Sequence, residues 1–121
     1  MLNTREEGKI GEELAIAHLR KAGYEIVQNN WHLHHLEIDI VARHQGELVF
    51  VEVKLRHSDE FGDPESFVTR SKQKLLVRAA NYYIEQQEIE AECRFDVIGI
   101  LAKNGKYSVH HIVNAFSPIE H

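Results

Sequence analysis

The stretch FVEVKLR, residues 50–56, is typical of a β-strand because it alternates in polarity and is rich in β-branched and aromatic residues. Alternation places Val51 and Val53 on one face of this strand, and Glu52 and Lys54 on the other. Strands this apolar usually lie inside a sheet. A carboxylate and an ammonium two residues apart on one face therefore need an explanation.

The preceding strand, LEIDIVAR at residues 36–43, is joined to it by a turn at residues 45–46. A hairpin centred on that turn pairs residues whose numbers sum to 91. It sets Asp39 directly opposite Glu52, on the same face, with Cβ atoms about 4.5–5.5 Å apart. It also sets Glu37 opposite Lys54. Alternation along residues 36–43 further predicts one shared face for Glu37, Asp39, Val41 and Arg43.

Two carboxylates that face each other on an apolar surface destabilise a sheet unless one is protonated or a cation lies between them. Mg²⁺ is held by one or two carboxylates with water, so the pair of Asp39 and Glu52 suits it. Lys54 then lies beside the pair, where it can bind a phosphate oxygen or orient a water. The competing interpretation is a plain ion pair of Lys54 with Asp39 or Glu37 on the solvent face of a sheet.

A helix predicted over residues 4–21 adds a third acid. Helical spacing aligns Glu12 with three small or apolar side chains: Gly8, Ala15 and Leu19. If this stripe is the buried one, Glu12 points toward the sheet. Alternatively, Glu12 is solvent-exposed near the helix start, where a negative charge suits the helix dipole. The spacing favours neither interpretation.

A second helix is predicted over residues 70–87, inside a run from 66 to 84 that has no acidic residue. Its inward stripe starts at Lys72, which we expect at the rim of the core face. A basic row faces outward: Arg70, Lys74 and Arg78. Such a row fits a phosphate backbone, although a solvated helix face is the commoner meaning.

The remaining strands are predicted at residues 24–29, 94–102 and 107–113, with a loop at 57–65. Helices beside one mixed sheet give an α/β class that borders on α+β, in a single domain over residues 1–121. No apolar run approaches the roughly 18 residues of a membrane span, and the first residues lack the apolar core of a signal peptide. One cysteine, Cys93, fits a reducing cytosol, so we expect a cytoplasmic protein without a membrane role. Zinc needs about four nitrogen or sulfur ligands, which makes a structural zinc the less favoured role for the histidines near residues 32–35 and 110–111.

Several short motifs together resemble the bacterial YraN family. They are G-x-x-G-E-x-x-A from Gly8, G-Y at Gly23, N-W at Asn30, E-I-D at Glu37, F-V-E-V-K at Phe50, Arg56, F-G at Phe61, Lys72 and R-F-D at Arg94. That family resembles the PD-(D/E)xK nuclease superfamily and, within it, Holliday-junction resolvases. The resemblance implies a restriction-endonuclease-like αβββαβ core. Leu36 and Leu55 depart from the family's usual Gly and Thr, but neither change removes an ionisable group.

The resemblance also implies roles for individual residues. Asp39 and Glu52 would hold Mg²⁺ (or Mn²⁺) with the Val53 carbonyl, and Lys54 and Glu12 would complete the catalytic set. We therefore expect an endonuclease that hydrolyses DNA, as a homodimer if it cuts both strands of a junction. Phosphate contacts are expected from Arg56, Arg70, Lys72, Lys74 and Arg78. The alternatives are a non-catalytic nucleic-acid-binding module and a partner-binding protein, which the net charge of −5 also allows.

Overall fold

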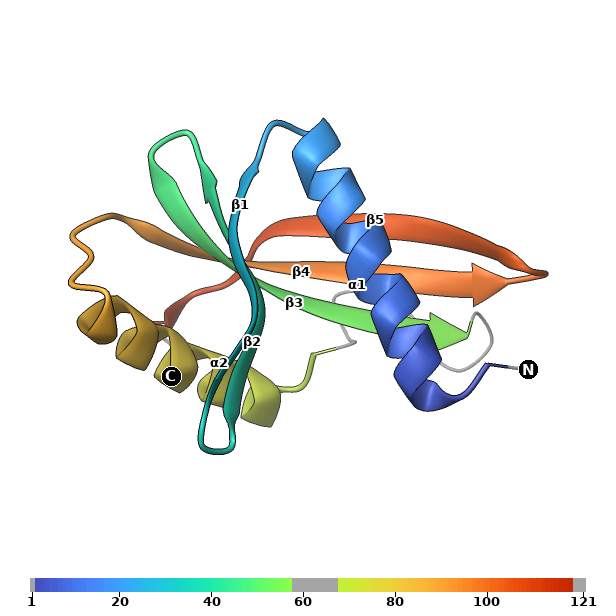
Figure 1. Ribbon diagram of the computed structural model, residues 1–121, viewed down its shortest axis with the longest axis horizontal. Coiled ribbons are helices and arrows are strands. Elements are labelled where there is room, and N and C mark those ends of the chain that lie inside the picture. Colours follow the sequence, from blue (N-terminus) through green and yellow to red (C-terminus); the bar gives the residue numbers. More distant parts are fainter. Residues whose placement is uncertain (1, 58–67, 119–121) are drawn as a thin grey trace.

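A computed structural model describes residues 2–57 and 68–118 of the chain. One mixed five-stranded sheet has the strand order β1-β2-β3-β4-β5 (Figure 1). Only β3 and β4 are parallel, joined through α2, and every other neighbouring pair is antiparallel. The elements are α1 (Thr4–Lys21), β1 (Glu25–Leu33), β2 (Leu36–His44), β3 (Glu47–His57), α2 (Arg70–Gln86), β4 (Cys93–Lys103) and β5 (Lys106–Phe116). This is the predicted α+β fold: the expected αβββαβ core is followed by one further strand, β5.

Helix α1 has the bounds that the sequence predicts, because both of its ends carry clear signals. Asn3 caps the N-terminus by accepting from the Glu6 amide at 2.8 Å, and the Glu6 side chain accepts from the Asn3 amide in return. Gly23, at φ +91°, follows the last turn in a backbone conformation that favours glycine. Ala15 and Leu19 are fully buried, whereas Glu12 lies at the edge of this stripe.

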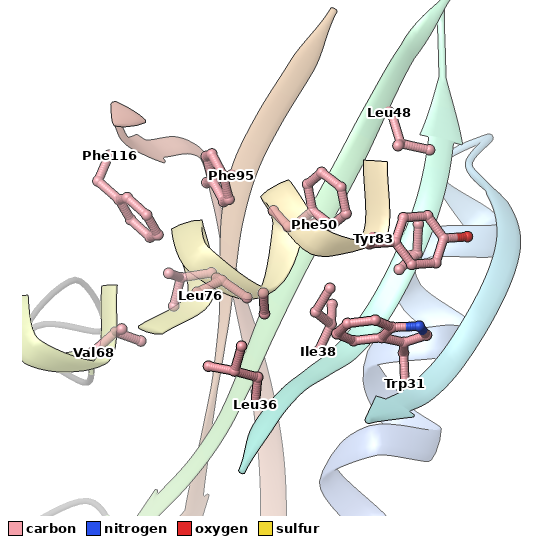
Figure 2. Close-up of a cluster of buried hydrophobic side chains, with 14 residues drawn as sticks. Trp31, Leu36, Ile38, Leu48, Phe50, Val68, Leu76, Tyr83, Phe95 and Phe116 are labelled. Atoms are coloured by element: carbon pink, nitrogen blue, oxygen red, sulfur yellow. The ribbon is translucent and has the colours of Figure 1, made fainter. Parts of the chain in front are cut away.

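Helix α2 begins after Thr69, whose hydroxyl accepts from the Lys72 amide. Its buried stripe contacts the largest apolar cluster of the protein. Figure 2 shows Leu76 and Tyr83 of α2 beside Phe50 of β3. The Tyr83 ring meets Trp31 and Phe50 edge-on, with centroids 5.7 and 5.8 Å away.

The two helices cover opposite faces of the sheet. On β3, Val49 and Val51 pack in the cluster under α1, whereas Leu48 and Phe50 pack in the cluster under α2. Accordingly, α1 contacts β1, β3 and β5, and α2 contacts β2 (Figure 1). The face on which a strand residue lies therefore decides which helix it meets.

The predicted hairpin register is confirmed from the turn as far as the pair Ile40–Val51. All five β2–β3 pairs have numbers that sum to 91, starting at His44–Glu47 next to the turn. Beyond Ile40 the two strands make no further ladder pair among the described residues. The hairpin thus opens at the residues where the sequence predicts the acidic pair.

The predicted alternation along β2 is wrong at the same point. Ile38 and Val41 both lie in the cluster under α2, whereas Ile40 lies in the cluster under α1. Regular alternation cannot place residues three apart on one face, so the strand changes phase between Ile38 and Ile40. On the neighbouring β1, Asn30 has a left-handed φ of +54°, which reverses the phase of that strand at the matching position.

No helix in the described ranges has the length and apolar character needed to cross a membrane. The F-G motif at residues 61–62 and most of the predicted loop lie outside the described residues.

Candidate active site

The candidate site begins where β2 and β3 separate. There the Val53 amide donates a hydrogen bond to Asp39 Oδ2 at 2.8 Å. A side chain therefore takes the backbone donor that a regular ladder would pair with a carbonyl. Asp39 is consequently fixed to β3, directly beside Glu52.

Glu52 is a buried acid, with only 2% of its surface exposed. Burial raises the pKa of its carboxyl from 4.5 to about 8, and the charge of Asp39 and a hydrogen bond with it act in the same direction. Lys72 and Lys54 lower this pKa, in that order of size, but they do not cancel the effect of burial. Glu52 Oε2 is buried and has no hydrogen-bond partner in the described part of the protein.

Lys72 approaches the acids from α2, at the rim where the sequence predicts it. Its Nζ lies 3.7 Å from Glu52 Oε2 and 3.7 Å from Glu37 Oε1. Glu37 pairs across the β1–β2 ladder with His32, whose Nε2 is 3.2 Å from Glu37 Oε2. The expectation that Glu37 faces Lys54 is therefore wrong, because the β2–β3 ladder has already ended.

An open cavity of about 890 Å³ lies between α1, β1 and the separated strands. Glu12 and Asp39 both line it, and the Glu12 carboxylate accepts from Asn29 Nδ2 at 3.0 Å. From β3 the cavity is lined by Val53 and Leu55. The other residues that line it are Arg5, Gly8, Lys9, Gly11, Glu13, Ile16, Asn29, Asn30, His32 and Glu37.

The donor set fits a divalent cation held by two protein carboxylates and water. In the described ranges, no three side chains of Asp, Glu, His or Cys come close enough to hold one metal ion. The close pair of Asp39 and Glu52 instead places two acids side by side and leaves the buried Glu52 Oε2 without a hydrogen bond to any described residue. A hard cation with oxygen ligands would relieve both features, and Mg²⁺ commonly keeps several waters beside one or two carboxylates. Glu12 lies on the cavity wall and forms no three-acid cluster with this pair in the described ranges.

The structure does not bring the basic row to this cavity. The row, Arg70, Lys74 and Arg78, is exposed on α2, across the sheet from α1. Arg56, near the end of β3, donates from Nη1 to the Leu55 carbonyl at 3.3 Å. Lys72, one of the predicted phosphate-binding residues, lies within ion-pair distance of the acids Glu52 and Glu37.

A second polar network, under the C-terminal half of α1, is missed by reasoning from the sequence. Fully buried Asp96 accepts two hydrogen bonds from Arg94, at 2.8 and 2.9 Å, and one from the Asn114 amide. Its Oδ2 also lies 2.7 Å from His111 Nε2, and His111 Nδ1 lies 3.1 Å from His18 Nε2. The R-F-D motif places Arg94 and Asp96 on one strand face, but no local signal indicates the histidines. This network ties α1 to β4 and β5.

The helices and strands of this α+β protein follow the order expected of a restriction-endonuclease-like core. The acidic pair lies on this core, where β2 and β3 separate. The model of the uncharacterised protein family UPF0102 matches residues 11–100, so the chain belongs to that family, the YraN family of the sequence resemblance. A UPF0102 protein of Flavobacterium psychrophilum is 40% identical over 96% of this chain and 98% of its own length. Similar proteins from Bacteroides thetaiotaomicron and Syntrophomonas wolfei are 43% and 45% identical, over 98% and 93% of this chain and 98% of each relative.

Proposed function

We propose that this protein is a Mg²⁺-dependent endonuclease that hydrolyses phosphodiester bonds in DNA. One observation carries the proposal: the buried Glu52 carboxyl lies beside Asp39, with Oε2 lacking a hydrogen bond among the described residues and with Lys72 Nζ 3.7 Å away. A folded protein gains no stability from such a pair. Its presence at the point where β2 and β3 separate favours a role in binding a cation.

Each residue has a distinct task in this proposal. Asp39 and Glu52 would hold Mg²⁺ or Mn²⁺, with the Val53 carbonyl as a further oxygen ligand. The bound ion would polarise a phosphate oxygen and acidify a water molecule. Lys54 offsets negative charge on the phosphate or orients the attacking water. Glu12, held by Asn29, would support a metal-bound water or a second metal ion.

A non-catalytic nucleic-acid-binding module is the second candidate. Lys72 lies within ion-pair distance of Glu52 and Glu37, so part of the acidic charge is already offset without a metal. Such a module would bind DNA with a steep salt dependence and would need no divalent ion. A protein partner remains the third candidate, given the net charge of −5.

The proposal includes a homodimer in the cytoplasm. Cutting both strands of a four-way junction takes two active sites, and a single cysteine suits a reducing compartment. Branched DNA is therefore the first substrate to test.

A cleavage assay on labelled linear, nicked, branched and single-stranded DNA, with Mg²⁺, Mn²⁺ or EDTA, tests the activity. We expect cleavage with either metal, none with EDTA, and a loss of at least about 100-fold in Lys54→Ala, as for other electrostatic catalytic groups. Lys106→Ala, an exposed lysine on β5, is the matched control and should cleave as the parent does. Metal-independent cleavage, or equal rates for both lysine variants, would exclude this site as the source of activity.

A further inference from the structure

No contact in the described part of the chain explains why residue 8 is a glycine. It lies inside α1, where glycine weakens a helix relative to alanine. A Cβ built on Gly8 has no described atom within 4 Å, so packing does not exclude a side chain there. By contrast, a Cβ on Gly11 meets Leu55 and Ile100 at ordinary contact distances of 3.6–3.7 Å.

Gly8 opens onto the same cavity as Asp39 and Glu12. Arg5 and Lys9 flank it on the helix surface and also line this cavity, and both are exposed. Neither has a salt bridge to any acid in the ranges that the structure describes. Two available cations therefore border a stretch of helix backbone that has no side chain.

We propose that this cavity receives the nucleic-acid strand that is cut, with Arg5 and Lys9 on its phosphates and Gly8 allowing the strand to approach α1 closely. The inference rests on the proposed function, and it names the path of the substrate. Glu12 follows Gly8 by about 6 Å along the helix axis. A strand that passes Gly8 thus continues toward the acids at the separated strands.

The location of the cavity favours this path over the basic row on α2. Arg70, Lys74 and Arg78 lie across the sheet from α1, and none of them lines the cavity. Lys72, which does reach the acids, is already within 3.7 Å of two carboxylates. The α2 row can add long-range attraction, but its residues do not line the cavity that Arg5 and Lys9 border.

The acids of the cavity predict that strand binding depends on a divalent ion. Glu12, Glu13, Glu37 and Asp39 line the cavity together with Arg5 and Lys9. A polyanion would be repelled at the acidic end unless a cation offsets that charge. Ca²⁺, which also takes oxygen ligands, should therefore strengthen the binding of an oligonucleotide.

The first test is the variant Gly8→Ala. Alanine should raise the melting temperature by roughly 3–5 °C, from its higher helix propensity. It should also weaken binding of a labelled oligonucleotide at least about fivefold, because a methyl group occupies the space of the strand. A variant that melts higher and binds as tightly as the parent would overturn the inference.

The second test compares two double variants, each lacking two basic side chains of α1. Fluorescence anisotropy measures their affinity for labelled single-stranded DNA in Ca²⁺. Arg5→Ala/Lys9→Ala should reduce the slope of log affinity against log salt by about 1.4, or about 0.7 for each lost contact with a single strand. Arg20→Ala/Lys21→Ala, at the other end of α1 and outside the cavity, is the matched control and should keep the slope of the parent.

The outcomes separate this inference from the proposed function. If Lys74→Ala/Arg78→Ala lowers affinity more than Arg5→Ala/Lys9→Ala, the strand follows α2 and the inference fails while the function stands. If the parent binds no nucleic acid in Ca²⁺ or EDTA, the proposed function and the inference fail together.

Discussion

Replacing Glu52 with glutamine should stabilise the protein, and the gain should grow with pH. In the unfolded chain this carboxyl ionises near pH 4.5, whereas burial raises its pKa in the folded protein to about 8. Between these values the folded state holds a proton that the unfolded state has lost, so stability falls as pH rises. The slope is about 1.4 kcal/mol per pH unit. Since pH 7 lies about 2.5 units above 4.5, the burial of Glu52 costs about 3 kcal/mol there.

Glutamine has nearly the shape of the protonated acid and does not ionise. Glu52→Gln should thus unfold like the parent at pH 4 and be about 3 kcal/mol more stable at pH 7. Saturating Mg²⁺ should stabilise the parent, by about 2.7 kcal/mol at 100 times its dissociation constant, and should leave Glu52→Gln nearly unchanged.

Urea unfolding between pH 4 and pH 9, followed by the fluorescence of Trp31, measures these differences. Trp31 is the only tryptophan and is buried, so its emission should report global unfolding. Glu37→Gln is the matched control: Glu37 contacts the same Lys72 but is exposed, and its loss should change stability by less than about 0.5 kcal/mol. A constant difference between Glu52→Gln and the parent at all pH values would refute a neutral, buried Glu52.

Three further predictions use the same unfolding assay. Asp39→Ala should be about 1–3 kcal/mol less stable than Asp39→Asn, because only asparagine keeps an acceptor for the Val53 amide; equal stability would contradict the importance of that bond. Lys72→Met removes a cation that lowers the pKa of Glu52, so stability should go on falling to a pH above 8 before it levels off. If stability levels off at the same pH as in the parent, Lys72 does not act on Glu52. Burial and the neighbouring His111 lower the pKa of His18, so stability should fall with acid below pH 6.5. His18→Gln should flatten that fall, and an equally steep one would assign it to another group.

Local signals made most of the fold predictable. The Asn3 cap and Gly23 mark the ends of α1, and the turn at residues 45–46 fixes the register that runs to Ile40–Val51. The ends of α1 and this register depend on neighbours in the sequence, which is why reasoning from one chain found them. The closeness of Asp39 and Glu52 was predicted from the same register, but the ladder has ended at Ile40–Val51, and the bond from the Val53 amide holds Asp39 beside Glu52 instead.

Features that depend on distant contacts were not predictable. The change of phase in β2 depends on Asn30 of another strand and on the two helices that bury opposite faces. The side-chain hydrogen bonds that link His18, His111 and Asp96 join residues up to 93 positions apart. The basic row on α2 was visible in the sequence, but its separation from the cavity was not. Only the packed sheet shows which helix covers which of its faces.

The hydrogen bond from the Val53 amide to Asp39 has a consequence for tracing activity through evolution. Asp39 contributes to folding whether or not the protein catalyses a reaction, so a descendant that lost its chemistry would still be selected to keep it. Glu52 differs, because burying it lowers stability at neutral pH. Without a ligand to bind, mutation should soon replace it with a neutral side chain. Under the proposed function, a retained glutamate at this position is therefore a better indicator of activity across divergent lineages than the aspartate.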